Sequence, residues 1–197
     1  MFTEPLLGTS ADRPRGWVEV ICGGMFSGKT EELIRRLNRA LIAKQHVEIF
    51  KPTVDKRYHK DDVVSHNERS IRSTPVDFAA DIPLMAGNCD VVGIDEAQFF
   101  DDGIIAVVRD LAKSGKRVIL AGLDMDFSGV PFGPMPTLLS IAEYVTKVHA
   151  VCMICGDVAS YSFRLTAKKE KVLLGEKSEY QARCRRCFEE GMKNYKK

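Results

Sequence analysis

The sequence of 197 residues is long enough for one medium-sized core with a small appendage. Its hydrophobic fraction of 45% and charged fraction of 28% are those of globular proteins and exclude a disordered chain. A net charge of +2 gives no electrostatic reason to expect a nucleic-acid partner, and no apolar run approaches the roughly 20 residues that span a bilayer.

Residues 1–15 have neither a basic start nor an apolar stretch. We therefore expect a disordered lead-in rather than a secretory signal, and a cytoplasmic location. In that reducing compartment, the six cysteines are expected to be metal ligands or core residues and not disulfides.

An apolar run over residues 17–22 predicts a buried strand, and a glycine-rich loop follows it. The loop has the pattern of a phosphate-binding loop, in which backbone N–H groups and a helix N-terminus surround the phosphates. Lys29 would reach the outer phosphates and the Thr30 hydroxyl would ligate Mg²⁺. A glycine-rich turn that binds nothing is the alternative, but the strand before and the helix after favour a nucleoside triphosphate site. The loop reads Gly23-Gly24-Met25-Phe26-Ser27-Gly28-Lys29-Thr30.

The residues that follow are spaced as an amphipathic helix. Its expected apolar face is formed by Leu33, Ile34, Leu37, Ala40 and Leu41. Its expected polar face is formed by Glu31, Glu32, Arg35, Arg36, Asn38 and Arg39.

Predicted strands and helices alternate along the rest of the chain. Because most of the strands are apolar throughout, the fold class is expected to be α/β, with a parallel sheet covered on both faces. The stretch from 53 to 72 is polar and irregular, and a loop of that length is usually functional or mobile. Strands are expected at 47–50, 91–94, 118–123 and 145–151, and helices at 77–86, 102–114 and 138–144.

Two adjacent acids follow the strand expected at 91–94. Asp95 is placed to act at the Mg²⁺ of a phosphate-loop site. Glu96 cannot face the same way from a strand end, so it could serve the phosphate acceptor. A carboxylate there can take the proton of an attacking hydroxyl, which contributes about 10²–10⁴-fold in rate. A solvated acidic turn is the alternative, and the phosphate loop disfavours it.

The sequence Asp95-Glu96-Ala97-Gln98 also resembles the acidic box of helicases, where the Glu activates water. Such a chain would be a nucleic-acid-binding ATPase with a zinc-ribbon contact surface. A helicase motor needs two such domains, whereas this chain has room for one, and the basic surface is missing.

Two Cys-x-x-Cys pairs, Cys152 with Cys155 and Cys184 with Cys187, flank the 28 residues from 156 to 183. Four thiolates suit tetrahedral Zn²⁺, and a closed Cys₄ site is structural. Four unliganded core cysteines are the alternative. The spacer is longer than the roughly 15–20 residues of zinc-ribbon signatures, so it must loop out. It could close over a small flat ligand and exclude water, or it could be a solvated hairpin. Cys22 and Cys89 are expected in the core.

From about Val18 to Cys187 the chain resembles the type II thymidine kinases, the cytosolic type. That resemblance implies a P-loop (RecA-like) core with a small zinc lobe that carries a lasso loop. It also implies transfer of the ATP γ-phosphate to the 5′-hydroxyl of thymidine, giving TMP and ADP for DNA synthesis, with Mg²⁺, structural Zn²⁺ and a homotetramer. The motifs that carry it are the phosphate loop, Lys51-Pro52, Asp55-Lys56-Arg57-Tyr58, Ile94 to Phe100, Leu123-Asp124 with Phe127, Pro131-Phe132-Gly133, Ala150-Val151-Cys152 and the four cysteines.

The resemblance also assigns roles to individual positions. Glu96 would be the general base, with Lys29, Asp55, Arg57 and Arg164 near the reacting groups. Asp95 would act with Thr30 at Mg²⁺, and Gln98 would lie on the nucleotide side. Ala97 stands where animal members commonly have glycine, and Glu176 stands where a second glycine is frequent, which leaves the path of the lasso open. The base pocket would be lined by Met25, Phe99, Leu123, Phe127 and Phe132 and closed by Ser162, Arg164, Leu173, Gly175 and Tyr180.

These patterns divide the chain into four parts. Residues 1–15 form the lead-in and residues 16–150 the nucleotide-binding domain. Residues 151–190 form the zinc and lasso lobe, and residues 191–197 a flexible basic tail. Neither nucleic acid nor membrane is expected as a partner.

Overall fold

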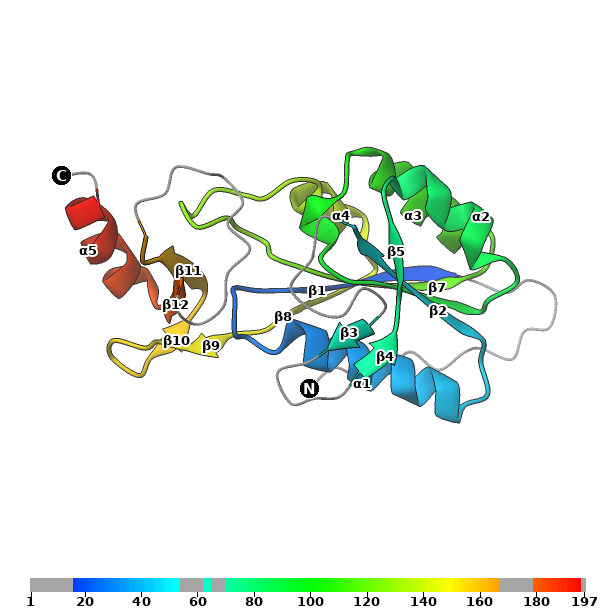
Figure 1. Ribbon diagram of the computed structural model, residues 1–197, viewed down its shortest axis with the longest axis horizontal. Helices are drawn as coiled ribbons and strands as arrows, with labels where there is room; N and C mark the ends of the chain where they lie inside the picture. The colour runs from blue at the N-terminus through cyan, green and yellow to red at the C-terminus, as the bar shows by residue number, and fades with distance from the viewer. Residues whose placement is uncertain (1–15, 54–61, 65–69, 167–178, 196–197) are drawn as a thin grey trace.

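The protein is built on a central parallel sheet, seen in a computed structural model that describes residues 16–53, 62–64, 70–166 and 179–195 (Figure 1). The sheet has six strands in the order β5-β2-β6-β7-β1-β8, and each neighbouring pair is parallel. The strands are β1 (Trp17–Cys22), β2 (Val47–Pro52), β5 (Thr74–Val76), β6 (Val91–Ile94), β7 (Arg117–Gly122) and β8 (Tyr144–Lys147).

Helices cover both faces of this sheet, which confirms the predicted α/β class (Figure 1). On one face, α1 (Lys29–Ile42) packs through Leu33, Ile34 and Leu37. The opposite face carries the larger apolar cluster, to which α3 and α4 contribute Ile104, Val108 and Leu138. The helices of this face are α2 (Ile82–Ala86), α3 (Gly103–Lys113) and α4 (Met135–Ile141).

Several element boundaries differ from the prediction. Within the stretch expected to be irregular, β3 (Asp62–Val64) and β4 (Ser70–Arg72) form an antiparallel hairpin, and β5 then joins the sheet edge beside β2. Strands of three residues are too short to show a period, so only tertiary pairing defines them. The strand expected at 145–151 divides into β8 and β9 (Ala150–Val151), which pair with different partners.

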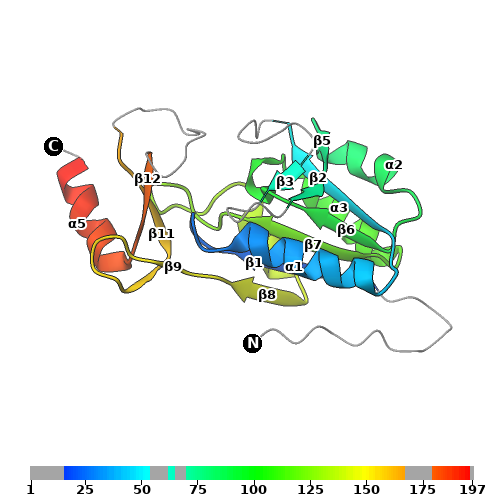
Figure 2. The same ribbon diagram turned by 60° about the horizontal axis from the view of Figure 1, so that its bottom comes forward.

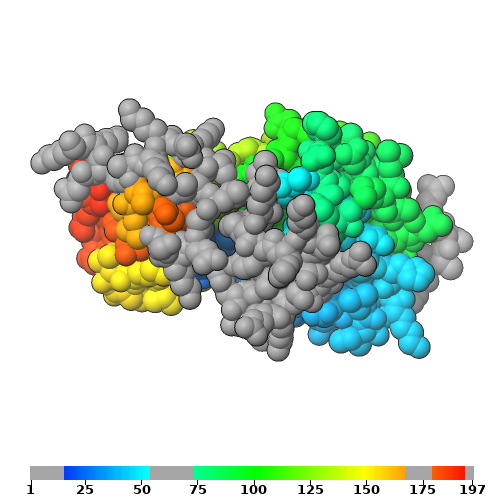
Figure 3. All heavy atoms as spheres, in the orientation of Figure 1, coloured from blue at the N-terminus to red at the C-terminus, as the bar shows by residue number. Residues whose placement is uncertain are grey.

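A small lobe follows the sheet. It consists of β9, β10 (Val158–Ala159), β11 (Tyr161–Arg164), β12 (Tyr180–Arg183), α5 (Arg185–Tyr195) and a core that includes three of the four paired cysteines. Figure 2 shows β8 leading from the sheet edge into β9, and Figure 3 shows the lobe, in yellow to red, beside the sheet domain. Residues 191–195, expected in a flexible tail, are helical, and Gly191 packs closely against Arg183 and Phe163.

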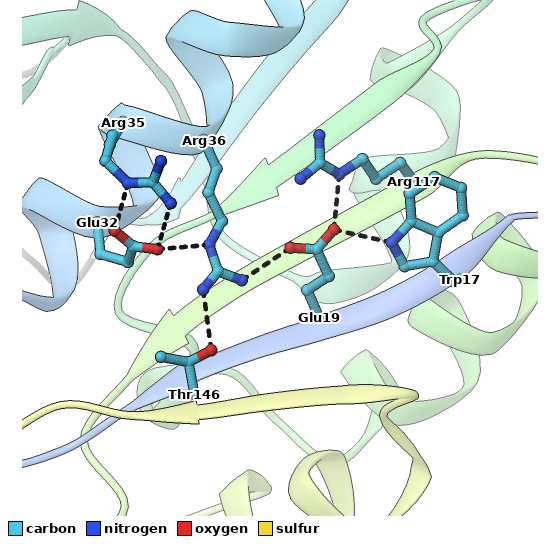
Figure 4. Close-up of polar contacts among 7 residues, drawn as sticks. All are labelled: Trp17, Glu19, Glu32, Arg35, Arg36, Arg117 and Thr146. Atoms are coloured by element: carbon cyan, nitrogen blue, oxygen red, sulfur yellow. Dashed lines mark hydrogen bonds and ion pairs between the residues drawn. The ribbon is translucent and has the colours of Figure 1, made fainter. Parts of the chain in front are cut away.

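A charged network lies inside the sheet domain (Figure 4). Glu19, in the middle of β1, is fully buried and accepts hydrogen bonds from Trp17 Nε1 at 2.8 Å and Arg117 Nε at 2.6 Å. Its other carboxylate oxygen accepts from Arg36 Nη1 at 2.7 Å. Arg36 continues to Thr146 Oγ1 at 2.9 Å, so the network joins β1, β7, β8 and α1.

The network corrects the expected faces of the first helix. Arg36, predicted on the polar face, is fully buried, whereas Leu41, predicted on the apolar face, is 46% exposed. Helical spacing pairs Arg36 with Glu32, and that ion pair does form at 2.8 Å. The second partner of Arg36 lies in another element, which periodicity within one helix does not reveal.

The described helices are all too short or too polar to cross a lipid bilayer.

Candidate active site

Four loops converge at the carboxyl edge of the sheet, where ligands of parallel α/β folds bind. The phosphate loop follows β1, Asp95 follows β6, and Leu123 follows β7. Lys147 ends the edge strand β8, and the next backbone N–H, that of Val148, donates to Cys22 O at 2.8 Å. The topology therefore brings together residues that are far apart in the sequence.

Glycines at two positions allow the phosphate loop its path. Gly23 has φ +149°, and a Cβ there would lie 2.2 Å from Val148 O. Gly28, with φ +84°, precedes the first residue of α1 and has left-handed backbone. The loop thus turns tightly around the N-terminus of a 14-residue helix, whose first N–H groups and dipole favour a bound anion.

Polar side chains of the loop face its interior and β6. Lys29 Nζ and Ser27 Oγ both donate to Gly24 O, at 2.8 and 2.7 Å. Thr30 Oγ1 lies 3.4 Å from Asp95 Oδ2. A hydroxyl and a carboxylate oxygen that face one another at a phosphate loop are ligands of the kind that Mg²⁺ uses with nucleotides, so these two residues could hold it.

Glu96 adopts a backbone conformation that is unusual for a residue with a side chain. Its φ of +51° and ψ of +41° are left-handed, which costs on the order of 1–3 kcal/mol. Its N–H donates to Asp95 Oδ1 at 2.9 Å, and a short 3₁₀ turn, η2 (Ala97–Phe99), follows. The turn sends the two carboxylates in different directions, Asp95 towards Thr30 and Glu96 towards Gln98.

Gln98 lies beneath Glu96 and is 2% exposed. Its Nε2 donates to Glu96 Oε2, and its Oε1 accepts from the Leu123 backbone N–H at 2.9 Å. The sequence analysis placed this side chain on the nucleotide side, and its amide lies between Glu96 and the end of β7. The sequence does not distinguish a Gln98 side chain that faces the nucleotide from one that faces Glu96, because a residue two places after Glu96 could do either.

The residues expected to line a base pocket form two contacting groups. Phe99 and Phe132 pack edge to face with ring centroids 5.6 Å apart. Arg164, 1% exposed, lies 3.7 Å from the ring centroid of Phe127 and donates to the Tyr180 hydroxyl from Nη2 at 2.7 Å. Four further candidates, Asp55, Arg57, Leu173 and Gly175, lie outside the described residues.

The small lobe supports the phosphate loop directly, a link that the sequence does not reveal. Ser162 Oγ on β11 accepts from the Met25 N–H at 2.9 Å. A Cβ on Gly24 would lie 3.3 Å from Ser160 O, so this part of the loop lies against the lobe. Phe26, with left-handed backbone at φ +64°, packs on the cluster that contains Cys152, Cys184 and Cys187.

The four paired cysteines form one cluster, with all Sγ atoms within 4.8 Å of one another. Cys155 Sγ and Cys184 Sγ are 3.7 Å apart, close to the edge of about 3.8 Å that four Zn–S bonds of 2.3 Å give a tetrahedron. The donor set therefore fits zinc, as predicted.

The thiol electrostatics of this cluster also favour a cation. Burial raises the pKa of Cys152, but backbone N–H groups of Cys184, Cys155 and Ile154 outweigh it and lower that pKa to about 6. Burial and the neighbouring thiols raise the pKa of Cys187 to about 12. Four sulfurs in contact cannot all be ionised without a compensating positive charge. Hydrogen bonds to the Cys187 and Cys155 thiols raise the pKa of Arg186, so its positive charge lies beside the sulfurs.

The other two cysteines are buried, as expected. Burial, with the nearby Asp124 carboxylate, raises the pKa of Cys22 to about 11, and burial also raises the pKa of Cys89. Both remain protonated thiols at neutral pH. Asp124 is itself paired with Lys147, whose Nζ lies 2.6 Å from Asp124 Oδ2.

Comparison with known proteins identifies the family to which this chain is similar. The family model for thymidine kinase matches residues 16–188. A protein named thymidine kinase from Bacteroides thetaiotaomicron is 62% identical over 176 residues, which cover 89% of this chain and 88% of that protein. Thymidine kinases from Porphyromonas gingivalis and Rhodothermus sp. are 62% and 60% identical, and each alignment covers 88% of this chain and 85% and 82% of the relative.

Proposed function

This chain belongs to the thymidine kinase family, and on that premise we propose that it transfers the γ-phosphate of ATP to the 5′-hydroxyl of thymidine. The products are thymidine 5′-monophosphate and ADP. Cytoplasmic nucleotide salvage for DNA synthesis is the setting in which this reaction is used.

The position of Glu96 carries the proposal. It follows Asp95 at the edge of the phosphate-loop site, on a strained turn that turns its side chain away from the Thr30–Asp95 pair. A carboxylate there accepts the proton of the 5′-hydroxyl as that oxygen bonds to the γ-phosphorus. The bond from the γ-phosphorus to the bridging oxygen breaks, and its electron pair leaves on ADP.

The phosphate loop supplies binding and charge stabilisation. Lys29 and the N-terminus of α1 bind the phosphates, and Thr30 with Asp95 holds Mg²⁺, which neutralises the charge that develops on the phosphoryl oxygens. Lys29 is prepositioned for this role by its hydrogen bond to Gly24 O at 2.8 Å.

The aromatic groups beside Glu96 suit a nucleoside acceptor. Phe99 and Phe132 present an edge-to-face pair, and Leu123 lies at the end of the adjacent strand. Phe127, Arg164 and Tyr180 brace the lobe side of the pocket. Enclosure of thymidine between them excludes water, which would otherwise accept the phosphoryl group.

Other parts of the proposal come from the resemblance. Asp55 and Arg57 act near the reacting groups, and Leu173 and Gly175 belong to the lasso that closes over the base. The four cysteines hold a structural Zn²⁺, and four copies of the chain assemble into a homotetramer. The lead-in and the nucleotide-binding domain keep approximately the boundaries given above, and the lobe continues to the end of α5 at Tyr195.

The test is a phosphorylation assay with Mg-ATP across the nucleosides, followed by chromatography of the products. Thymidine-dependent formation of ADP and the monophosphate is expected. Glu96→Gln should lower kcat by about 10²–10⁴-fold and leave the Kd for ATP nearly unchanged. Glu48→Gln is the matched control, because Glu48 is exposed near the start of β2. If the rate of ADP release were independent of thymidine and increased with DNA or RNA instead, the proposal would be overturned in favour of a nucleic-acid-dependent ATPase.

A further inference from the structure

We propose that Gln98 is a positioning residue that holds the Glu96 carboxylate in its reactive orientation and anchors it to the end of β7. This inference rests on the proposed function, because it gives Gln98 its role through the general base. It differs from the role that the resemblance implies, in which Gln98 contacts the nucleotide.

The orientation of the Gln98 amide follows from its two partners. A backbone N–H can only donate, so the atom that faces the Leu123 N–H at 2.9 Å must be the carbonyl oxygen Oε1. The amide nitrogen then faces Glu96 Oε2 and donates to it. The two contacts agree on one orientation. In a flipped amide the NH₂ group would face the Leu123 N–H, and the carbonyl oxygen would face the Glu96 carboxylate.

The side chain of Gln98 is closely surrounded by neighbouring elements. It is 2% exposed. A Cβ on Gly122 would lie 2.9 Å from Gln98 Oε1 and 2.7 Å from Met135 Sδ, and a Cβ on Gly133 would lie 2.5 Å from Gln98 O. The glycine at position 122 thus lets β7 approach the side-chain amide, and the glycine at position 133 lets its turn approach the backbone carbonyl of Gln98.

These contacts fix Glu96 from two sides. The left-handed backbone sets the direction in which the side chain leaves the chain, and the amide hydrogen bond holds the carboxylate oxygen Oε2 in place. The anchor of Gln98 is the Leu123 N–H, which directly follows β7, and β7 lies between β6 and β1 in the sheet and pairs with both. Glu96 is therefore located relative to the strand that carries the phosphate loop. A donated hydrogen bond also favours the ionised carboxylate, which is the form that accepts a proton.

Gln98→Glu is the sharpest test, because it keeps the size of the side chain and an acceptor for the Leu123 N–H. It replaces the donor to Glu96 by a second carboxylate. We expect kcat at pH 7 to fall at least tenfold and the acid limb of the kcat–pH profile to move up by about one pH unit or more, because two carboxylates in contact retain a shared proton. The Kd for ATP should stay within twofold.

Gln45→Glu is the matched control. It makes the same change beyond the far end of α1, about 20 Å from the phosphate loop for a helix of 14 residues. Its kcat and pH profile should equal those of the wild type.

Gln98→Asn is a second variant that buries no charge and is one methylene too short to reach both partners. It should lower kcat at least tenfold with the KM for ATP unchanged. Gln98→Leu should likewise lower kcat and leave the KM for ATP unchanged. An unchanged kcat and pH profile in these variants, or a large rise in the Kd for ATP at constant kcat, would overturn the positioning role. A wild-type protein that fails to phosphorylate thymidine would instead overturn the proposed function.

Discussion

The backbone N–H of Met25 in the phosphate loop donates a hydrogen bond to the Ser162 hydroxyl on β11, at 2.9 Å. Phe26 packs against the cysteine-rich core of the same lobe. Two successive residues of the loop are thus supported by a lobe whose own core is small and relies on its cysteine cluster.

Removal of zinc should therefore weaken nucleotide binding, although the cysteines are distant in sequence from the loop. After chelation we expect the Kd for ADP, measured by calorimetry, to rise, because Phe26 and Met25 lose their support. Ser162→Ala should weaken ADP binding in the metal-loaded protein by about 0.5–1.5 kcal/mol, or roughly 2–12-fold. Zinc content measured on the same samples separates the two causes. Unchanged ADP affinity in fully demetallated protein would contradict this coupling.

Gly23→Ala should damage the phosphate loop far more than an ordinary glycine replacement. Its Cβ would lie 2.2 Å from Val148 O, so the loop or the start of the lobe must move. We expect loss of ATP binding and a marked drop in Tm. Gly87→Ala is the control, because Gly87 also has positive φ, +47°, but a Cβ there has nothing within 4 Å. Because its ψ of −131° lies outside the left-handed helical region, that control should cost about 1–3 kcal/mol of stability through backbone strain alone, and it should leave ATP binding intact.

Glu19→Gln should destabilise the protein by about 3–5 kcal/mol, because Arg36 and Arg117 would keep their charges in the interior without the carboxylate between them. Urea unfolding at pH 7 measures this change. Asp110→Asn removes an exposed pair with Lys113 and should change stability by less than about 0.5 kcal/mol. Equal effects of the two substitutions would show that the buried network contributes no more than a surface pair.

The pH dependence of stability should include a small contribution from Glu32. Hydrogen bonds from Arg35, with a further one from Arg36, hold the pKa of the Glu32 carboxyl below its ordinary value. A depressed folded-state pKa stabilises the protein above the unfolded value of about 4.3, and this stabilisation is lost as the pH falls through the folded value. Solvent screening limits it to about 0.5 kcal/mol, because Arg35 is half-exposed. Glu32→Gln should therefore lower stability at pH 7 and converge with the wild type in acid. A difference that grows below pH 4 would contradict this sign.

The parts of the fold and site that could be predicted are those whose signal is local. Three motifs indicate their chemistry within a few residues each: the phosphate loop, the adjacent acids and the Cys-x-x-Cys pairs. The central strands are apolar enough to be recognised as buried, and their alternation with helices gives the parallel sheet.

The missed features depend on contacts between distant elements. Glu19 interrupts an apolar strand, and only its contact with Arg36 and Arg117 explains its burial. Gln98 could face either the nucleotide or Glu96, and the Leu123 N–H decides its orientation. Ser162 supports Met25 across two folding units, and neither segment carries a pattern that names the other.

The buried carboxylate of Glu19 also penalises any other register of β1 against its neighbours β7 and β8. A slip of β1 by one residue against β7 and β8 would turn Glu19 away from α1 and among the apolar side chains around Val18 and Val20. Only the native alignment keeps this charge among cations. Since Gly23 directly follows the last residue of β1, the same alignment sets how far the phosphate loop projects beyond the sheet, and thereby its position relative to Asp95 and Glu96 at the end of β6.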